Sequence, residues 1–211
     1  MKSLVSLLIF VLLLGAVGVS ARAGTVTYQV IVDTSSANGD RGYIDLLLNE
    51  GPNPPVLDVT GTIFGFTSDA VLDPSSTQPI DSSGALPGAV TVGNTFTSDY
   101  FEGLTFGSSI MFDITLDGPG VSLDGGLTGA NSGSTFWLTF YENDGVTPLF
   151  ASGSSAEIDI DATGTVSASA LAENTTLQEV VPEPSTLWLS GFAGLLAFAF
   201  RRMRRTAWRF R

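Results

Sequence analysis

Hydrophobic and polar residues alternate along most of the chain between residues 24 and 170. Alternation puts every second side chain on one face of an extended segment, which is the pattern of a β-strand with one buried face. No helical period of any length appears before Leu187, so the pattern predicts an all-β domain of about nine strands. The main segments are residues 25–33, 41–49, 56–66, 89–96, 100–106, 110–116, 136–140, 156–160 and 165–170, with shorter ones expected at 70–72 and 146–151.

Turn-forming residues separate these segments about every ten residues. Asn38–Asp40, Asp117–Gly120 and Glu142–Gly145 are typical turn sequences, and residues 73–84 read as an exposed loop. Glycines within residues 56–66 interrupt the alternation and predict a β-bulge or a close sheet contact. Many short strands with regular turns favour a β-sandwich of jelly-roll or immunoglobulin-like kind over residues 24–170.

The chain changes character after residue 170. Residues 171–181 are polar and predict a linker, which is followed by an apolar run from Leu187 to Phe200. The arginines after this run would stay in the cytoplasm and stop transfer of a single transmembrane helix; they are Arg201, Arg202, Arg204 and Arg205. Residues 186–200 are fewer than the ~17–25 residues of an ordinary membrane-spanning helix. A buried helix or a loose hydrophobic tail is therefore the alternative.

The N-terminus has the pattern of a signal peptide. Lys2 precedes an apolar stretch over residues 4–19, and the small residues Ala21 and Ala23 predict cleavage before Gly24. Cleavage two residues earlier and an uncleaved anchor are the alternatives. The sequence therefore predicts an exported domain with residues 1–23 removed.

Residues 182–211 combine a short motif, an apolar helix and a basic tail, and this combination resembles the PEP-CTERM sorting signal. The motif itself is Val181, Pro182, Glu183, Pro184 and Ser185. The resemblance implies processing by an exosortase, with Glu183 as the residue that the enzyme reads. It also implies a Gram-negative host that makes exopolysaccharide, a transient inner-membrane anchor, and a final place at the cell surface or in a biofilm matrix.

Composition excludes several functions. Arg41 is the only basic residue between Gly24 and Pro184, against 21 acidic residues, so this span has a net charge of −20. Such a charge excludes nucleic acid and anionic membrane surfaces as partners. The chain has no Cys and no His, which removes thiol catalysis and the commonest general base. We therefore expect no enzymatic activity and no cofactor.

Three further features are candidates for binding or modification. Asp159, Asp161 and Thr163 form a fragment of a calcium loop, although Asp and Gly are also ordinary turn residues. Asn174 fits the pattern of a glycosylation acceptor within the predicted linker. Aromatic side chains could stack against sugars, although core packing is the alternative, which we favour for Trp137; they are Tyr100, Phe101, Trp137 and Tyr141.

Asp113 with Glu142 or Glu157 would be candidate carboxylate pairs for glycoside hydrolysis. Acidic residues are so frequent in this chain, however, that the presence of two of them is no evidence for a glycosidase. The leading hypothesis is a non-enzymatic, exported surface or matrix protein with a structural or adhesive part. The alternative is a β-sandwich module that binds carbohydrate or calcium.

Overall fold

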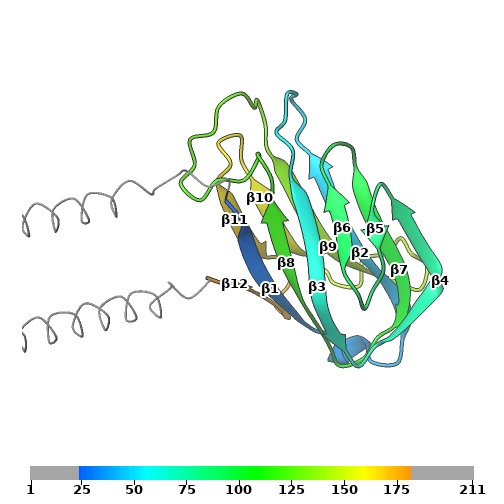
Figure 1. Ribbon diagram of the computed structural model, residues 1–211. Coiled ribbons are helices and arrows are strands. Elements are labelled where there is room, and N and C mark those ends of the chain that lie inside the picture. The colour runs from blue at the N-terminus through cyan, green and yellow to red at the C-terminus, as the bar shows by residue number, and fades with distance from the viewer. Residues whose placement is uncertain (1–23, 182–211) are drawn as a thin grey trace, which may run out of the picture. The chain divides into compact units, whose positions relative to one another are not determined.

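The computed structural model describes residues 24–181, which form two antiparallel six-stranded sheets packed face to face as a β-sandwich (Figure 1). The first sheet has the order β12 (Thr175–Glu179), β1 (Val26–Asp33), β8 (Ser109–Asp117), β3 (Thr60–Ser68), β6 (Val90–Gly93) and β5 (Ser83–Gly84). The second has the order β11 (Val166–Ala170), β10 (Ser154–Ile160), β9 (Ser134–Glu142), β2 (Arg41–Glu50), β7 (Ser98–Thr105) and β4 (Val71–Ile80). A single 3₁₀ turn, Ser35–Ala37, lies between β1 and β2.

The chain passes from one sheet to the other at both lateral edges of the sandwich. At one edge β4 is followed by β5, and at the other β11 is followed by β12. Most strands that are consecutive in the sequence lie in opposite sheets. The neighbours of β2 in its sheet, β7 and β9, consequently come from far along the chain. These long-range pairs fix β2 in the middle of the second sheet.

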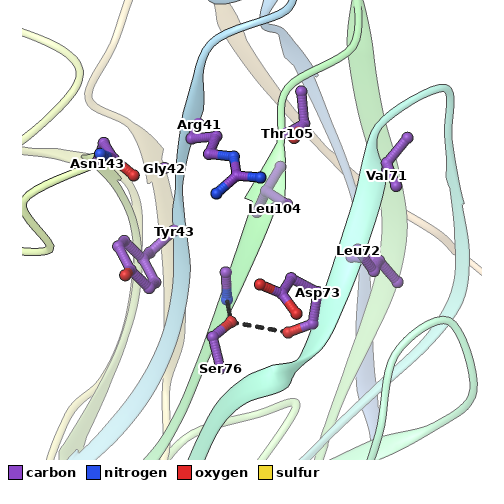
Figure 2. A pocket seen from close by; sticks show the side chains of 11 residues that line it. Arg41, Gly42, Tyr43, Val71, Leu72, Asp73, Ser76, Leu104, Thr105 and Asn143 are labelled. Atoms are coloured by element: carbon purple, nitrogen blue, oxygen red, sulfur yellow. Dashed lines mark hydrogen bonds between the residues drawn. The ribbon is translucent and has the colours of Figure 1, made fainter.

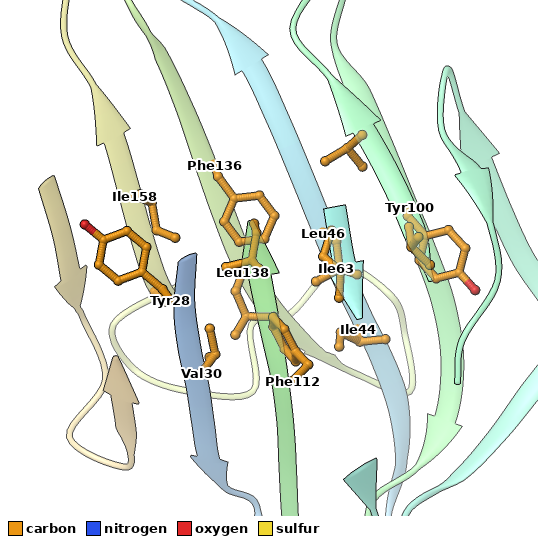
Figure 3. Packing of buried hydrophobic residues seen from close by; sticks show 14 of the residues in the cluster. Tyr28, Val30, Ile44, Leu46, Ile63, Tyr100, Phe112, Phe136, Leu138 and Ile158 are labelled. Carbon is orange, nitrogen blue, oxygen red and sulfur yellow. The ribbon is translucent and has the colours of Figure 1, made fainter. Parts of the chain in front are cut away.

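The core lies between the two sheets and consists of the inward side chains predicted by the alternation. Val30 and Phe112 from the first sheet meet Ile44 and Leu138 from the second (Figure 3). All four are at most 1% exposed. Burial of this apolar surface is the main stabilising term of the fold, at about 25 cal/mol per Å².

The predicted irregularity in residues 56–66 is confirmed. The register between β3 and β8 shifts between Phe64 and Thr67, and Gly65 adopts a φ of 66° within this bulge. A positive φ is easily reached only by a residue without a Cβ, which is why the strand carries glycine here.

The number and position of the strands differ from the prediction. The structure has 12 strands in the part of the chain it describes, against about nine predicted. Residues 73–84, predicted as a loop, instead form most of β4 and all of β5, because an exposed edge strand needs backbone pairing and few apolar side chains. Residues 146–151, predicted as a strand, make only isolated bridges to their neighbours.

The prediction of a linker over residues 171–181 is wrong for residues 175–179. Thr175–Glu179 forms β12, which pairs with β1 from Val32↔Thr175 to Tyr28↔Glu179. Thr175 is 6% exposed and Leu177 packs against the core, while Thr176 and Gln178 face solvent. The Val180 N–H also donates to the Thr27 carbonyl at 2.8 Å. The folded domain therefore extends to Val180 rather than ending at residue 170.

Candidate functional site

The outer faces of the two sheets differ in chemistry. On the first sheet, cross-strand polar pairs satisfy one another, with Thr27 and Thr115 hydroxyls 2.8 Å apart and the Gln29 amide donating to Asp113 at 3.4 Å. The outer face of the second sheet instead carries aromatic rings and carboxyl groups. The second face is therefore the one that departs from an ordinary solvated sheet surface.

Three rings form an aromatic cluster on this face, namely Tyr43 from β2, Phe101 from β7 and Tyr141 from β9. The rings of Tyr43 and Phe101 are stacked with centroids 4.7 Å apart, and those of Phe101 and Tyr141 are tilted at 5.8 Å. All three are half-buried. Such spacing lies within the favourable range for aromatic pairs, so the rings support one another while keeping part of their surface in solvent.

Two carboxyl groups, Asp45 of β2 and Asp99 of β7, form an acid pair within this face. Ile44 and Leu46 point into the core, so alternation turns Asp45 outward, where Phe101 is its cross-strand partner. Asp45 is nevertheless only 8% exposed, and the Oδ1 atoms of both carboxyls are buried without a hydrogen-bond partner among the described residues. Buried acceptors without partners are rare in folded proteins.

Burial and mutual repulsion perturb this acid pair. Desolvation, followed by the contact with Asp99, raises the pKa of Asp45 to about 8. Desolvation also raises the pKa of Asp99. Because two neighbouring carboxylates disfavour double ionisation, the pair retains one proton at neutral pH.

Two hollows open along β7 beside the aromatic cluster, and the Tyr43 ring lines both. The first has a volume of about 330 Å³ and is lined by Gly103 of β7. Residues of β2 and β4 line it from its two sides (Figure 2). The second, also about 330 Å³, lies over Asp99 and Phe101 and is bounded by Ile80 and Gly145. The pair of hollows spans β7 from Asp99 to Thr105, about 20 Å at the usual rise per residue.

The walls of the first hollow carry opposite charges. Figure 2 shows Arg41 from β2 and Asp73 from β4 pointing into it from opposite sides. The Gly103 N–H donates to the Ser76 hydroxyl at 2.9 Å, and that hydroxyl donates to the Asp73 carbonyl at 2.7 Å. A Cβ at residue 103 would collide with the same hydroxyl, so the glycine allows β4 to lie close against β7.

A second polar pair lies inside the sandwich. Tyr100 and Glu102 point inward from β7, both fully buried, and the tyrosine hydroxyl donates to Glu102 Oε2. Burial raises the pKa of Glu102, and burial together with the neighbouring carboxyl raises the pKa of Tyr100 to about 12. Tyr100, one of the aromatic side chains predicted to stack on sugars, therefore faces the core and has no access to a ligand.

The structure reverses the expectation for Trp137, which we favoured as a core residue. It is half-buried on the outer face of β9, opposite Leu47 of β2. Phe101 and Tyr141 lie on the same outer face of the sheet, so three of the four aromatic side chains proposed for sugar stacking face outward, although Trp137 is not part of the aromatic cluster. Both faces of β9 carry bulky side chains, and alternation alone does not tell which face is buried.

The residues predicted for calcium binding are engaged in local hydrogen bonds. Asp161 Oδ1 accepts from the backbone N–H groups of Thr163 at 2.7 Å and Thr165 at 3.0 Å, while Asp159 accepts from the Thr135 hydroxyl at 3.0 Å. Between residues 24 and 181 no cluster of three or more Asp, Glu, His or Cys side chains is placed to hold a metal ion. Calcium binding by Asp159, Asp161 and Thr163 stays a prediction.

The predicted glycosylation acceptor is part of the fold rather than of a linker. Asn174 precedes β12, and its side-chain amide donates to the Asp33 carbonyl at 2.7 Å. The Asp33 N–H donates in turn to the Asn174 carbonyl at 2.9 Å. A glycan on this amide would take one of the two hydrogens of the nitrogen that donates the first of these bonds.

The predicted processing sites flank the folded domain closely. Gly24, before which signal peptidase is expected to cut, donates its N–H to the Val121 carbonyl at 3.1 Å. Val181, the first residue of the sorting motif, is 67% exposed and follows β12 by two residues. Residues 1–23, the remainder of the motif, the apolar run and the arginines lie outside the described residues. Within residues 24–181 no helix is long and apolar enough to cross a membrane.

Sequence reasoning missed Tyr43, Asp45 and Asp99 as site residues. Asp45 interrupts the apolar run Ile44–Leu48. This interruption is the one sequence feature that could have indicated the site, because a carboxyl group in a buried strand needs a hydrogen-bond or charge partner. Asp99 and Tyr43 are unremarkable in the sequence. Only the register of β2 against β7 brings them to one place.

Comparison with known protein families identifies one segment of the chain. Residues 180–205 match the PEP-CTERM protein-sorting motif, and their first residue directly follows β12. Comparisons with curated proteins and with solved structures gave no match for this chain. Directly after its β-sandwich domain, the chain therefore carries a PEP-CTERM protein-sorting motif, consistent with an exosortase substrate.

Proposed function

We propose that this chain is a non-enzymatic structural or adhesive protein of the cell surface or extracellular matrix, delivered there by exosortase. The observation that carries the proposal is the PEP-CTERM motif at residues 180–205, which implies export and membrane-anchored processing to the cell surface. A Gram-negative host and an exopolysaccharide-containing matrix belong to the proposal.

The proposed route has two processing steps. Signal peptidase cuts before Gly24, and the apolar run from Leu187 holds the exported protein in the inner membrane for a time. Arg201 to Arg205 keep the end of the chain in the cytoplasm. Exosortase then acts at the motif, with Glu183 as the residue it recognises between two prolines.

The composition of the chain supports a non-enzymatic role for the domain. The chain has neither His nor Cys, and Arg41 is the only basic residue among the described ones. The acid pair does not supply a glycosidase either, because its carboxyls contact each other, whereas such enzymes hold theirs about 5 Å or more apart. A structural or adhesive role requires a stably folded domain, and this sandwich with its continuous core supplies one.

The proposal is tested by changing the motif. A variant with Pro182→Ala, Glu183→Ala and Pro184→Ala is expected to stay full-length in the membrane fraction, while the wild-type chain is shortened at its C-terminus and leaves it. Intact mass and fractionation in the native host give the readout. Glu173→Ala, which removes an exposed acid ahead of β12, is the matched control and should be processed normally. Normal release of the triple variant would contradict the proposal.

Carbohydrate binding is the second candidate function, and the aromatic cluster favours it. A surface or matrix protein in contact with polysaccharide would use such a face for adhesion. No comparable observation favours calcium binding, for which calcium-dependent thermal stabilisation would be the test.

A further inference from the structure

We propose that the outer face of the second sheet is a binding site for a neutral polysaccharide, which lies along β7 with a sugar ring over the aromatic cluster. The inference deepens the proposed function, because a surface or matrix protein would meet such a polymer at its destination. Four features of the described residues carry it: exposed ring surface, unpartnered acceptors, the shape of the face, and the charge of the domain.

Ring surface is available where a sugar would stack. Tyr43 and Phe101 are stacked on each other at 4.7 Å and border both hollows along β7. Gly145, in the turn after β9, lies against both rings and leaves them uncovered by a side chain. The apolar C–H face of a sugar fits such rings, because stacking buries apolar surface while the ring hydroxyls stay free to hydrogen-bond.

The acid pair supplies acceptors for those hydroxyls. Asp45 is more than nine-tenths buried, yet its Oδ1 atom and that of Asp99 have no donor among the described residues. Asp99 lines the second hollow, so a ligand there meets this carboxyl group; the two Oδ1 atoms are closed to solvent, and a hydroxyl reaches them only when a carboxyl turns toward the hollow. A buried acceptor without a donor is unfavourable by about the strength of a lost hydrogen bond, and a sugar hydroxyl is a donor of suitable size.

The shape of the face argues against a peptide added as a strand. β7 is paired with β2 along one side and with β4 along the other, so its backbone offers no free edge for such a partner. The hollows are instead open above the side chains of β7 and run along it for about 20 Å. An extended chain of sugar rings, which binds through its faces and hydroxyls, suits this arrangement.

Charge restricts the class of polysaccharide. Asp73, Asp99 and Asp144 line the two hollows and Asp45 contacts Asp99, whereas Arg41, on the wall of the first hollow, is the only cation among the described residues. A uronate or sulfated polymer would be repelled by this face. Within the proposal we therefore take the ligand to be a neutral polysaccharide rather than an anionic one.

The test is affinity electrophoresis of the exported protein in gels that contain a neutral glucan or galactomannan, with alginate as the anionic comparison. We expect retardation in a neutral gel and none in alginate. Phe101→Ala should lower the affinity at least tenfold, and Asp99→Asn should lower it as well.

Phe64→Ala is the matched control, because Phe64 is an exposed ring on the outer face of the first sheet. It should bind as the wild type does, and thermal melting of each variant shows whether the fold is kept. Equal retardation of folded Phe101→Ala and wild type, retardation only in alginate, or no retardation in any neutral gel would overturn the inference. Sorting is read from intact mass in separate samples, so failure of this site leaves the proposed delivery route unaffected.

Discussion

Replacing Asp45 by Asn should make the stability of the domain less sensitive to pH. The folded pKa of Asp45 is raised to about 8, whereas an unfolded aspartate titrates near ~3.9. The folded state therefore binds a proton that the unfolded state has lost, so wild-type stability falls as pH rises from about 4 to 8 and is level above that range. The amide of the Asp45→Asn variant carries no charge at any pH, so the variant should not show this loss.

The size of the effect follows from the pKa difference. Four pKa units correspond to about 5 kcal/mol as an upper bound, at 1.36 kcal/mol per unit. Asp99 is in contact with solvent, which screens the repulsion, so we expect about half of this value, roughly 2–3 kcal/mol. For a domain of this size the melting temperature should then rise by about 5–10 °C relative to the wild type between pH 4 and pH 9.

Thermal unfolding followed by circular dichroism from pH 4 to pH 9 measures the difference. Asp113→Asn is the matched control, because it removes a carboxylate from the outer face of the first sheet and leaves the acid pair intact. Its profile should keep the wild-type slope. A constant offset between Asp45→Asn and wild type across the pH range would refute the reasoning about the acid pair.

Three further predictions concern the fold. Phe140→Ala should lower the free energy of unfolding by about 3–5 kcal/mol in a denaturant titration, because Phe140 is fully buried and packs edge-on against Phe106 and Phe150; a loss below ~1 kcal/mol would contradict this packing. A chain that ends at Ala172 lacks β12, in which Thr175 is buried and Leu177 packs against the core. Its free energy of unfolding should be lower by roughly 2 kcal/mol or more than that of a chain that ends at Val181. Equal melting temperatures of the two chains would show that residues 173–181 are a linker. Hydrogen bonds from the Ser108 hydroxyl and from the backbone of Ser108 and Ser109 lower the pKa of Asp69 to about 2. The ionised carboxylate therefore stabilises the fold above pH ~4, and this stabilisation is lost as pH falls through 2. Asp69→Asn should have a lower melting temperature than the wild type at pH 6 and the same one near pH 2; an equal difference at both pH values would exclude a stabilising role of the Asp69 carboxylate.

The sequence predicted the class of fold because alternation is a direct consequence of strand geometry. Val30, Ile44 and Phe112 are buried as their pattern indicates. Edge strands were harder to predict, since β4, β5 and β12 are held by backbone pairing and carry few apolar side chains. Their sequences resemble loops for that reason.

The candidate site was only partly predictable, because it depends on which strands are neighbours. Phe101 and Tyr141 were candidates from residue type alone. Tyr43 joins them through the pairing of β2 with β7 and β9, between segments almost 60 to 100 residues apart along the chain. Alternation tells which residues share a face of one strand, but not which strands lie side by side.

The central claim is that export and sorting deliver this β-sandwich outside the cell. Intact mass with N- and C-terminal sequencing of the protein from the medium and envelope of the native host tests it most directly. The account predicts a product that begins near Gly24 and ends near Pro184, so that it keeps β12 and lacks the apolar run. A membrane-bound product that still carries Trp188 to Arg211 would contradict it.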